Sequence, residues 1–177
     1  MLTKTLNVGI IGLSMGLHHV RGIKKAAASH FTLDADGHKI PAFAVYSICD
    51  INQHLAEEVG REESIPHVYT DYKDMIADPA LDVVIVVTPD QLHREMVENS
   101  LAAGKHVLCE KPLAITREDC EAIAAAVEKS DRKFMVGQIC RYTPGFRQAK
   151  EIIDSGAIGE LTFVESEYAH DYSKISS

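Results

Sequence analysis

Apolar runs alternate with helix-length segments along the first 140 residues. Strands are predicted over 6–13, 42–49, 67–69, 82–88, 106–109 and 134–139. Helices are predicted between them, up to about residue 28 and over 52–61, 71–77, 90–103 and 116–129. The run 82–88 is the strongest strand, because its β-branched residues suit the centre of a sheet that is buried on both faces. This alternation requires right-handed crossovers and a parallel sheet with helices on both sides.

The sequence therefore predicts an α/β fold with a doubly wound, mostly parallel sheet over residues 1–140. Residues 29–41 are polar and rich in turn formers, so we expect an insertion there, with a hairpin tip at 34–37. Beyond residue 140 the pattern changes. A helix is expected over 144–155, and the alternating segment 161–168 predicts a half-exposed strand that opens a second, mixed or antiparallel sheet.

Composition and charge narrow the function classes. The net charge of -8 argues against a basic surface for nucleic acid. No apolar run is long enough to span a bilayer, and the start of the chain lacks a signal-peptide layout, so no membrane association and a cytoplasmic location are expected. The four cysteines form no Cys-x-x-Cys pair and no Cys/His cluster with ligand spacing. They predict free thiols and no metal site.

A glycine-containing turn follows the first strand. A strand, glycines and a helix start form the setting in which backbone N–H groups hold a pyrophosphate. In the Gly-x-Gly-x-x-Gly fingerprint, Ser14 replaces the second glycine after Gly12, and Gly16 arrives one residue early. Either the loop is one residue shorter, or Leu17 takes the third position. Met15 lies in the same turn, and a tight turn without any ligand explains the motif equally well.

An acidic residue ends the second strand. In dinucleotide-binding sheets a carboxylate at this place accepts hydrogen bonds from the adenosine ribose. Asp50 has this position, and its charge would repel a 2′-phosphate, so NAD is favoured over NADP. Asp50 could also cap the helix that starts near Asn52, and the two roles are compatible.

Two further segments follow strands of the predicted sheet. Thr88, Pro89 and Asp90 end the central strand, and Thr88 and Asp90 could line a cofactor groove. His93 is a further candidate cofactor-binding residue, although a packing or capping role is the preferred interpretation. Arg141 follows the last strand and could contact cofactor or substrate, or only join two domains.

Glu110, Lys111 and Pro112 directly follow the strand predicted over 106–109, so we expect them at the edge of the sheet where ligands bind. An ammonium there could hold a substrate hydroxyl and stabilise a developing alkoxide during hydride transfer. We therefore expect Lys111 to be the catalytic residue. Glu110 is a candidate cofactor-binding residue and could fix the lysine by pairing with it. A solvated surface turn is the alternative.

Taken together, these motifs resemble the glucose–fructose oxidoreductase / inositol dehydrogenase / rhizopine catabolism (Gfo/Idh/MocA) family. The matching segments, in the family's order, are 8–12, 49–50, 71–74, 88–93, 103–112, 141–144 and 156–159. The resemblance implies a Rossmann domain in a two-domain NAD(P)-dependent oxidoreductase that acts on sugars or cyclic polyols. It also implies that Lys111 is the family's lysine, Asp50 its ribose ligand, and Gly12, Ser14 and Gly16 its phosphate turn.

The length departs from this family, whose members are about twice as long. Residues 141–177 are therefore expected to begin an incomplete α+β substrate and oligomerisation domain. The family's Asp and His, four residues apart, have no match before Ser177. A truncated oxidoreductase that binds NAD, and that forms homo-oligomers if its substrate domain is present, is the leading hypothesis. A non-catalytic dinucleotide sensor is the alternative, and a methyltransferase ranks last.

Overall fold

The computed structural model describes residues 4–28 and 42–169, so the expected insertion at 29–41 and its hairpin tip lie outside the described residues. Contacts divide the chain into two compact units, residues 1–137 and 138–177. The first unit is built on a six-stranded sheet with the order β3-β2-β1-β4-β5-β6. All adjacent strands are parallel, which confirms the predicted sheet. The strands are β1 (Leu6–Ile11), β2 (Phe43–Cys49), β3 (His67–Tyr69), β4 (Val83–Val86), β5 (His106–Cys109) and β6 (Phe134–Val136).

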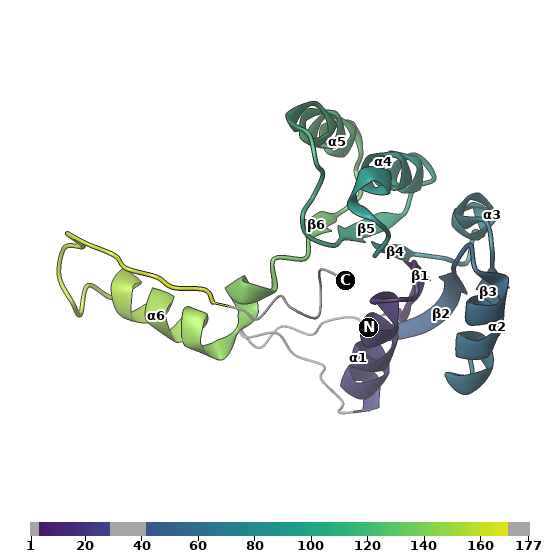
Figure 1. Cartoon of the computed structure of the whole chain (residues 1–177), viewed down its shortest axis with the longest axis horizontal. Helices are drawn as coiled ribbons and strands as arrows, with labels where there is room; N and C mark the ends of the chain where they lie inside the picture. The colour runs from purple at the N-terminus through teal and green to yellow at the C-terminus, as the bar shows by residue number, and fades with distance from the viewer. Residues whose placement is uncertain (1–3, 29–41, 170–177) are drawn as a thin grey trace. The chain divides into compact units, whose positions relative to one another are not determined.

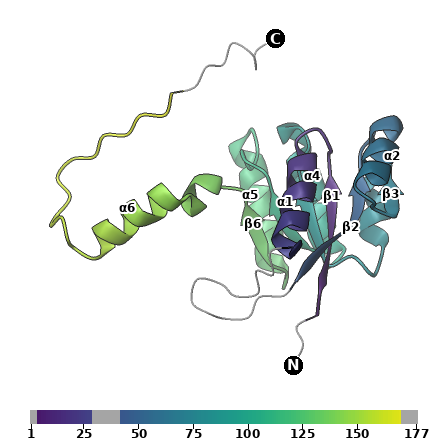
Figure 2. The ribbon, with the colours of Figure 1, turned by 90° about the horizontal axis from the view of Figure 1, so that it is seen from below.

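Helices cover both faces of this sheet, as expected for a doubly wound fold. They are α1 (Gly16–Ala28), α2 (Gln53–Glu62), α3 (Tyr72–Ala77), α4 (His93–Ala102) and α5 (Arg117–Lys129). Figure 1 shows α1 and α2 on one side of the strands and α3, α4 and α5 on the other. Figure 2, seen from below, looks onto α1, with the strands and then α4 and α5 behind it.

Two apolar clusters lie on the two faces of the sheet. One contains residues of α1 and α2, and the other contains residues of α3, α4 and α5. Successive residues of a strand point to opposite faces. In β4, Val84 and Val86 therefore join the second cluster, whereas Ile85 joins the first. This explains why the sequence of β4 is apolar at every position.

Local capping determines where several helices begin and end. The side chains of Asn52, Asp71 and Thr116 accept hydrogen bonds from the first turns of α2, α3 and α5. Gly104 follows α4 with φ +75°, a conformation that glycine adopts without strain. The helix expected over 90–103 begins later than predicted, and Asp90 does not cap it. Asp90 starts a 3-10 turn, η1 (Asp90–Leu92), and α4 then begins at His93 without a side-chain cap.

The second unit contains a 3-10 turn, η2 (Ile139–Tyr142), and a helix, α6 (Pro144–Asp154). The predicted helix over 144–155 is thus confirmed, but the predicted strand over 161–168 is wrong for the described residues. An alternating pattern forms a strand only when another strand supplies hydrogen bonds, and the described part of this unit has none to pair with it. Among the residues that the structure describes, no helix combines the length and apolar character of a membrane span.

Candidate functional site

The candidate residues of the first unit gather at the carboxyl edge of the sheet. Gly12 follows β1, Asp50 follows β2, Thr88 lies beyond β4, and Glu110 follows β5. The chain winds outward in opposite directions from β1 and β4, which are neighbours in the sheet. Ligands of open α/β sheets bind at such a switch point, outside the carboxyl ends of the strands.

A groove of about 600 Å³ lies at this edge. The candidate residues Gly12, Ser14, Asp50, Thr88 and Pro89 line it. Residues that the sequence analysis did not select complete the lining: Ile11, Leu13, Cys49, Ile51, Thr70, Asp71, Tyr72, Lys73, Val87, Leu92, Glu95 and Met96. The groove is therefore formed by the ends of β1, β2, β3 and β4, together with the starts of α3 and α4.

The turn after β1 requires both of its glycines. Gly12 has φ +88°, and a Cβ added there would lie 2.6 Å from the carbonyl oxygen of Val87. Gly16 is the first residue of α1, and a Cβ there would lie 2.9 Å from the Ile10 side chain. Gly16 therefore allows the close helix–strand packing of the fingerprint's third glycine. Of the two alternatives, the loop that is one residue shorter is correct.

The start of α1 is open. Ser14 and Met15 are exposed, and none of the described residues accepts a hydrogen bond from the N–H groups of Ser14, Met15 or Gly16. These N–H donors lie at the N-terminal end of a helix, where the helix dipole favours the binding of an anion.

The Asp50 carboxylate is held by two backbone donors. Its Oδ2 atom accepts from the N–H of Leu13 at 2.8 Å, and its Oδ1 atom accepts from the N–H of Asn52 at 2.9 Å. Asn52, rather than Asp50, caps α2 by accepting from Leu55. Asp50 thus ties the turn after β1 to the end of β2, and its remaining lone pairs are available to a ligand in the groove.

A polar cluster that the sequence analysis missed closes one wall of the groove. The Tyr72 hydroxyl donates to Glu95 at 2.6 Å, and the Lys73 ammonium lies 3.6 Å from the same carboxylate. Burial, and then the contact with Glu95, raise the pKa of Tyr72 to about 12. The hydrogen bond from Tyr72 lowers the pKa of Glu95. The signal in the sequence was the place of Thr70 directly after a parallel strand, which puts this segment at the same sheet edge.

The Lys111 segment is arranged differently from the expectation. The Glu110 carboxylate contacts His19 Nε2 at 2.9 Å and accepts from the backbone N–H of Lys111 at 3.1 Å. The predicted pairing of Glu110 with the Lys111 ammonium is therefore wrong. Lys111 is exposed, and no described residue forms a hydrogen bond or an ion pair with its ammonium. Neither residue lines the groove.

His93 is buried and contacts the backbone of two separate segments. Its side chain is 1% exposed, with Nδ1 3.0 Å from the carbonyl oxygen of Pro112 and Nε2 2.9 Å from that of Thr88. These contacts support the packing interpretation, and a contact of His93 with the cofactor stays a prediction. Asp90, half-buried in η1, does not line the groove either.

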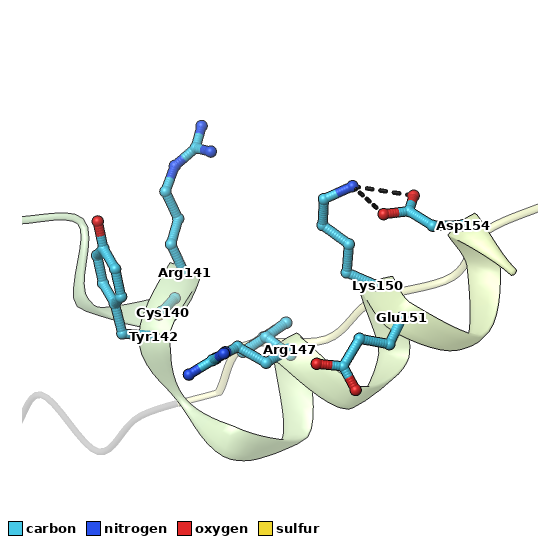
Figure 3. Close-up of a pocket in the computed structure, with 8 residues that line it drawn as sticks. Cys140, Arg141, Tyr142, Arg147, Lys150, Glu151 and Asp154 are labelled. Atoms are coloured by element: carbon cyan, nitrogen blue, oxygen red, sulfur yellow. Dashed lines mark hydrogen bonds and ion pairs between the residues drawn. The ribbon is translucent and has the colours of Figure 1, made fainter. Parts of the chain in front are cut away.

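Arg141 lies in the second unit, on the wall of a separate hollow of about 640 Å³ between η2 and α6. Figure 3 shows the Arg141 and Lys150 side chains extending to the same side of the ribbon. Lys150 pairs with Asp154 at 2.6 Å. A contact between Arg141 and the cofactor stays a prediction.

The described part of the chain contains no group of three His, Cys, Asp or Glu residues able to hold a metal ion. Cys49 and Cys109 are buried, free thiols at the ends of β2 and β5. Burial raises the pKa of each to about 12, so neither supplies a thiolate near neutral pH.

Known proteins resemble this chain in sequence and in fold. A family model described as "Oxidoreductase family, NAD-binding Rossmann fold" (GFO_IDH_MocA) matches residues 6–138. Levoglucosan dehydrogenase of Pseudarthrobacter phenanthrenivorans is 37% identical over 172 residues, which are 96% of this chain and 42% of that protein. Inositol 2-dehydrogenase of Pseudomonas savastanoi pv. phaseolicola is 37% identical over 158 residues, 88% of this chain and 43% of that protein.

A solved structure of levoglucosan dehydrogenase in complex with NADH matches with a TM-score of 0.80 and 35% identity, covering 88% of this chain and 41% of that one. The chain spans less than half the length of the curated relatives described above. The match over residues 6–138 removes the methyltransferase alternative. The chain belongs to the Gfo/Idh/MocA family of oxidoreductases, which has an NAD-binding Rossmann fold.

Proposed function

We propose that this chain is the cofactor-binding part of an NAD-dependent dehydrogenase that acts on a sugar or polyol. The observation that carries the proposal is the Asp50 carboxylate, which the N–H of Leu13 holds at 2.8 Å inside the groove that begins at Gly12. The similarity to levoglucosan and inositol dehydrogenases supports the substrate class. The homo-oligomer and the cytoplasmic location inferred from the sequence stay predictions.

The residues of the groove fit NAD. The N–H groups of Ser14, Met15 and Gly16, which no described residue accepts from, suit a pyrophosphate, and the remaining lone pairs of Asp50 suit ribose hydroxyls. The same carboxylate would repel the 2′-phosphate of NADP, and Asp71 adds negative charge to the lining, whereas the charge of Glu95 is paired with that of Lys73. When bound, NAD supplies the carbon that accepts or gives the hydride.

Lys111 would act on the substrate. Its ammonium is exposed and has no partner among the described residues, so it is available to a substrate hydroxyl. A cation beside that oxygen stabilises the negative charge that develops as the hydride leaves. A dinucleotide sensor without turnover is the second candidate, because the groove forms without any contribution from Lys111.

Calorimetric titration of the chain with NADH and NADPH tests the cofactor assignment. The native chain is expected to bind NADH more tightly, and Asp50→Ala is expected to weaken NADH binding about 10-fold, because it removes charge-assisted hydrogen bonds. Asp131→Asn changes an acidic residue whose side chain is 81% exposed and which lies outside the groove, so it is the matched control. Tighter binding of NADPH by the native chain would contradict the assignment.

The Lys111→Ala variant distinguishes the hypothesis of an enzyme from that of a dinucleotide sensor. An enzyme that contains this chain loses polyol oxidation in Lys111→Ala, whereas a sensor has no such oxidation to lose. Polyol oxidation that persists in Lys111→Ala would contradict the catalytic role of Lys111.

A further inference from the structure

A side-chain bridge joins the Lys111 segment to the helix that follows the phosphate turn. His19 lies in the first turn of α1, three residues after Gly16, and its Nε2 atom is 2.9 Å from Oε1 of Glu110. The two side chains are 27% and 22% exposed, so the contact is largely shielded from water. These residues are 91 positions apart, and the fold alone brings them together.

The Glu110 carboxylate has little freedom. Its second oxygen accepts from the backbone N–H of Lys111, and its own N–H donates to the carbonyl of Val86 at 2.9 Å. Gly137 closes the other side, since a Cβ added there would lie 3.2 Å from the carboxyl carbon. The Glu110 side chain therefore joins α1 to the main chain of Lys111, its backbone N–H bonds to β4, and Gly137, directly after β6, leaves no room for a side chain beside the carboxylate.

This arrangement holds the backbone of Lys111 while leaving its ammonium without a partner. A group that positions a catalytic amine has to act in this way, because a direct ion pair would compete with the substrate for the ammonium. The other end of the bridge lies on the helix whose first N–H groups suit the cofactor phosphates. The bridge thus spans the distance between the proposed phosphate site and the proposed catalytic lysine.

We propose that His19 and Glu110 are positioning residues that fix Lys111 relative to the phosphate-binding start of α1. The inference rests on the proposed function and deepens it. It predicts that the bridge affects the binding of the nicotinamide half of the cofactor, because this half would contact the Lys111 segment. The adenosine diphosphate half depends instead on Asp50 and the turn after β1.

Two ligands distinguish these halves. NADH carries both, whereas ADP-ribose lacks the nicotinamide ring. His19→Ala is expected to weaken NADH binding about 3- to 10-fold, the worth of one charge-assisted hydrogen bond, and to leave ADP-ribose affinity within about 2-fold of the native value. Glu110→Ala is expected to have the same effect, and the double variant is expected to lose no more NADH affinity than either single variant, because both changes remove the same contact.

The controls separate positioning from stability. His18 is the exposed neighbour of His19, and the side chain of His18 has no partner among the described residues. His18→Ala is therefore expected to leave the affinities for NADH and ADP-ribose unchanged. His19→Gln keeps an N–H donor near the position of Nε2 and is expected to restore part of the NADH affinity. Thermal unfolding of each variant shows whether the fold is retained.

Equal weakening of NADH and ADP-ribose in His19→Ala would overturn the inference, since a structural role affects both ligands alike. Unchanged NADH affinity would overturn it as well. A native chain that binds neither ligand would overturn the proposed function, and with it this inference. A native chain that binds both, with no difference between the variants, would overturn the inference alone.

Discussion

Gly12 and Gly22 lie ten residues apart and tolerate a methyl group very differently. At Gly12 the backbone φ is +88°, and an added Cβ would lie 2.6 Å from the Val87 carbonyl oxygen. At Gly22, in the middle of α1, no atom lies within 4 Å of an added Cβ. Gly12 is thus required by both conformation and space, whereas Gly22 only lowers the helix propensity of α1.

Alanine substitution at the two sites is expected to have opposite effects. Gly12→Ala should lower the free energy of unfolding by about 2 kcal/mol or more and weaken NADH binding, because the backbone near Val87 must move. Gly22→Ala should raise the free energy of unfolding by about 0.5–1 kcal/mol without changing NADH affinity. Urea unfolding and NADH titration measure both quantities. Native stability and affinity in Gly12→Ala would show that the turn can relax around the methyl group.

At the scale of elements, Glu63 links α1 to the end of α2. Its carboxylate accepts from Arg21 at 2.8 Å and from Lys24 at 3.0 Å, and its side chain is 14% exposed. The hydrogen bonds from Arg21 and Lys24 lower the pKa of Glu63. Because the folded state holds the charged form more strongly than the unfolded chain does, this contact makes stability depend on pH.

Glu63→Gln is expected to be less stable than the native chain at pH 7. The stabilisation by Glu63 is present above the pKa of an unfolded glutamate, about 4.3. It is lost as the pH falls through the lower, folded-state pKa. The difference in thermal unfolding temperature should therefore shrink as the pH is lowered from 5 to about 3. Glu62→Gln, an exposed neighbour, is the control, and a difference that stays constant with pH would contradict this role of Glu63.

The elements also show which features a sequence can reveal. Local signals sufficed for the helices predicted over 71–77 and 116–129, which begin at the caps Asp71 and Thr116, and for the continuous apolar strand β4, because a few neighbouring residues determine them. The segment 161–168 has the pattern of a strand, but pattern alone does not supply a partner.

Contacts between distant segments account for the errors at the site. Glu110 was expected to pair with its neighbour Lys111, but the fold offers it His19. The wall of the groove made by Tyr72 and Glu95 was missed for the same reason, since it requires α3 and α4 to be placed side by side. The edge of the sheet and the residues that directly follow its strands, such as Asp50 and Thr88, could be predicted, whereas the pairs of side chains that meet across it could not.

At the scale of the whole molecule, the candidate site belongs to one unit. Every residue that lines the groove lies between residues 11 and 96, and both apolar clusters lie within residues 1–137. In the second unit, all of the described residues 138–169 are exposed. These include large apolar residues such as Phe146 and Phe163. The first unit therefore contains its own core, whereas the second has little buried surface to stabilise it.

A chain shortened to end at Gly137 is therefore expected to unfold cooperatively and to bind NADH within about 2-fold of the 177-residue chain, since the residues of the groove and of its supporting core are all retained. Calorimetry on both chains measures the two affinities. The comparison also tests Arg141, because the shortened chain lacks it. If NADH affinity falls about 10-fold in the shortened chain and equally in Arg141→Ala of the longer one, Arg141 contacts the cofactor and the site extends beyond the first unit. If the shortened chain fails to fold, the core within residues 1–137 depends on residues of the second unit.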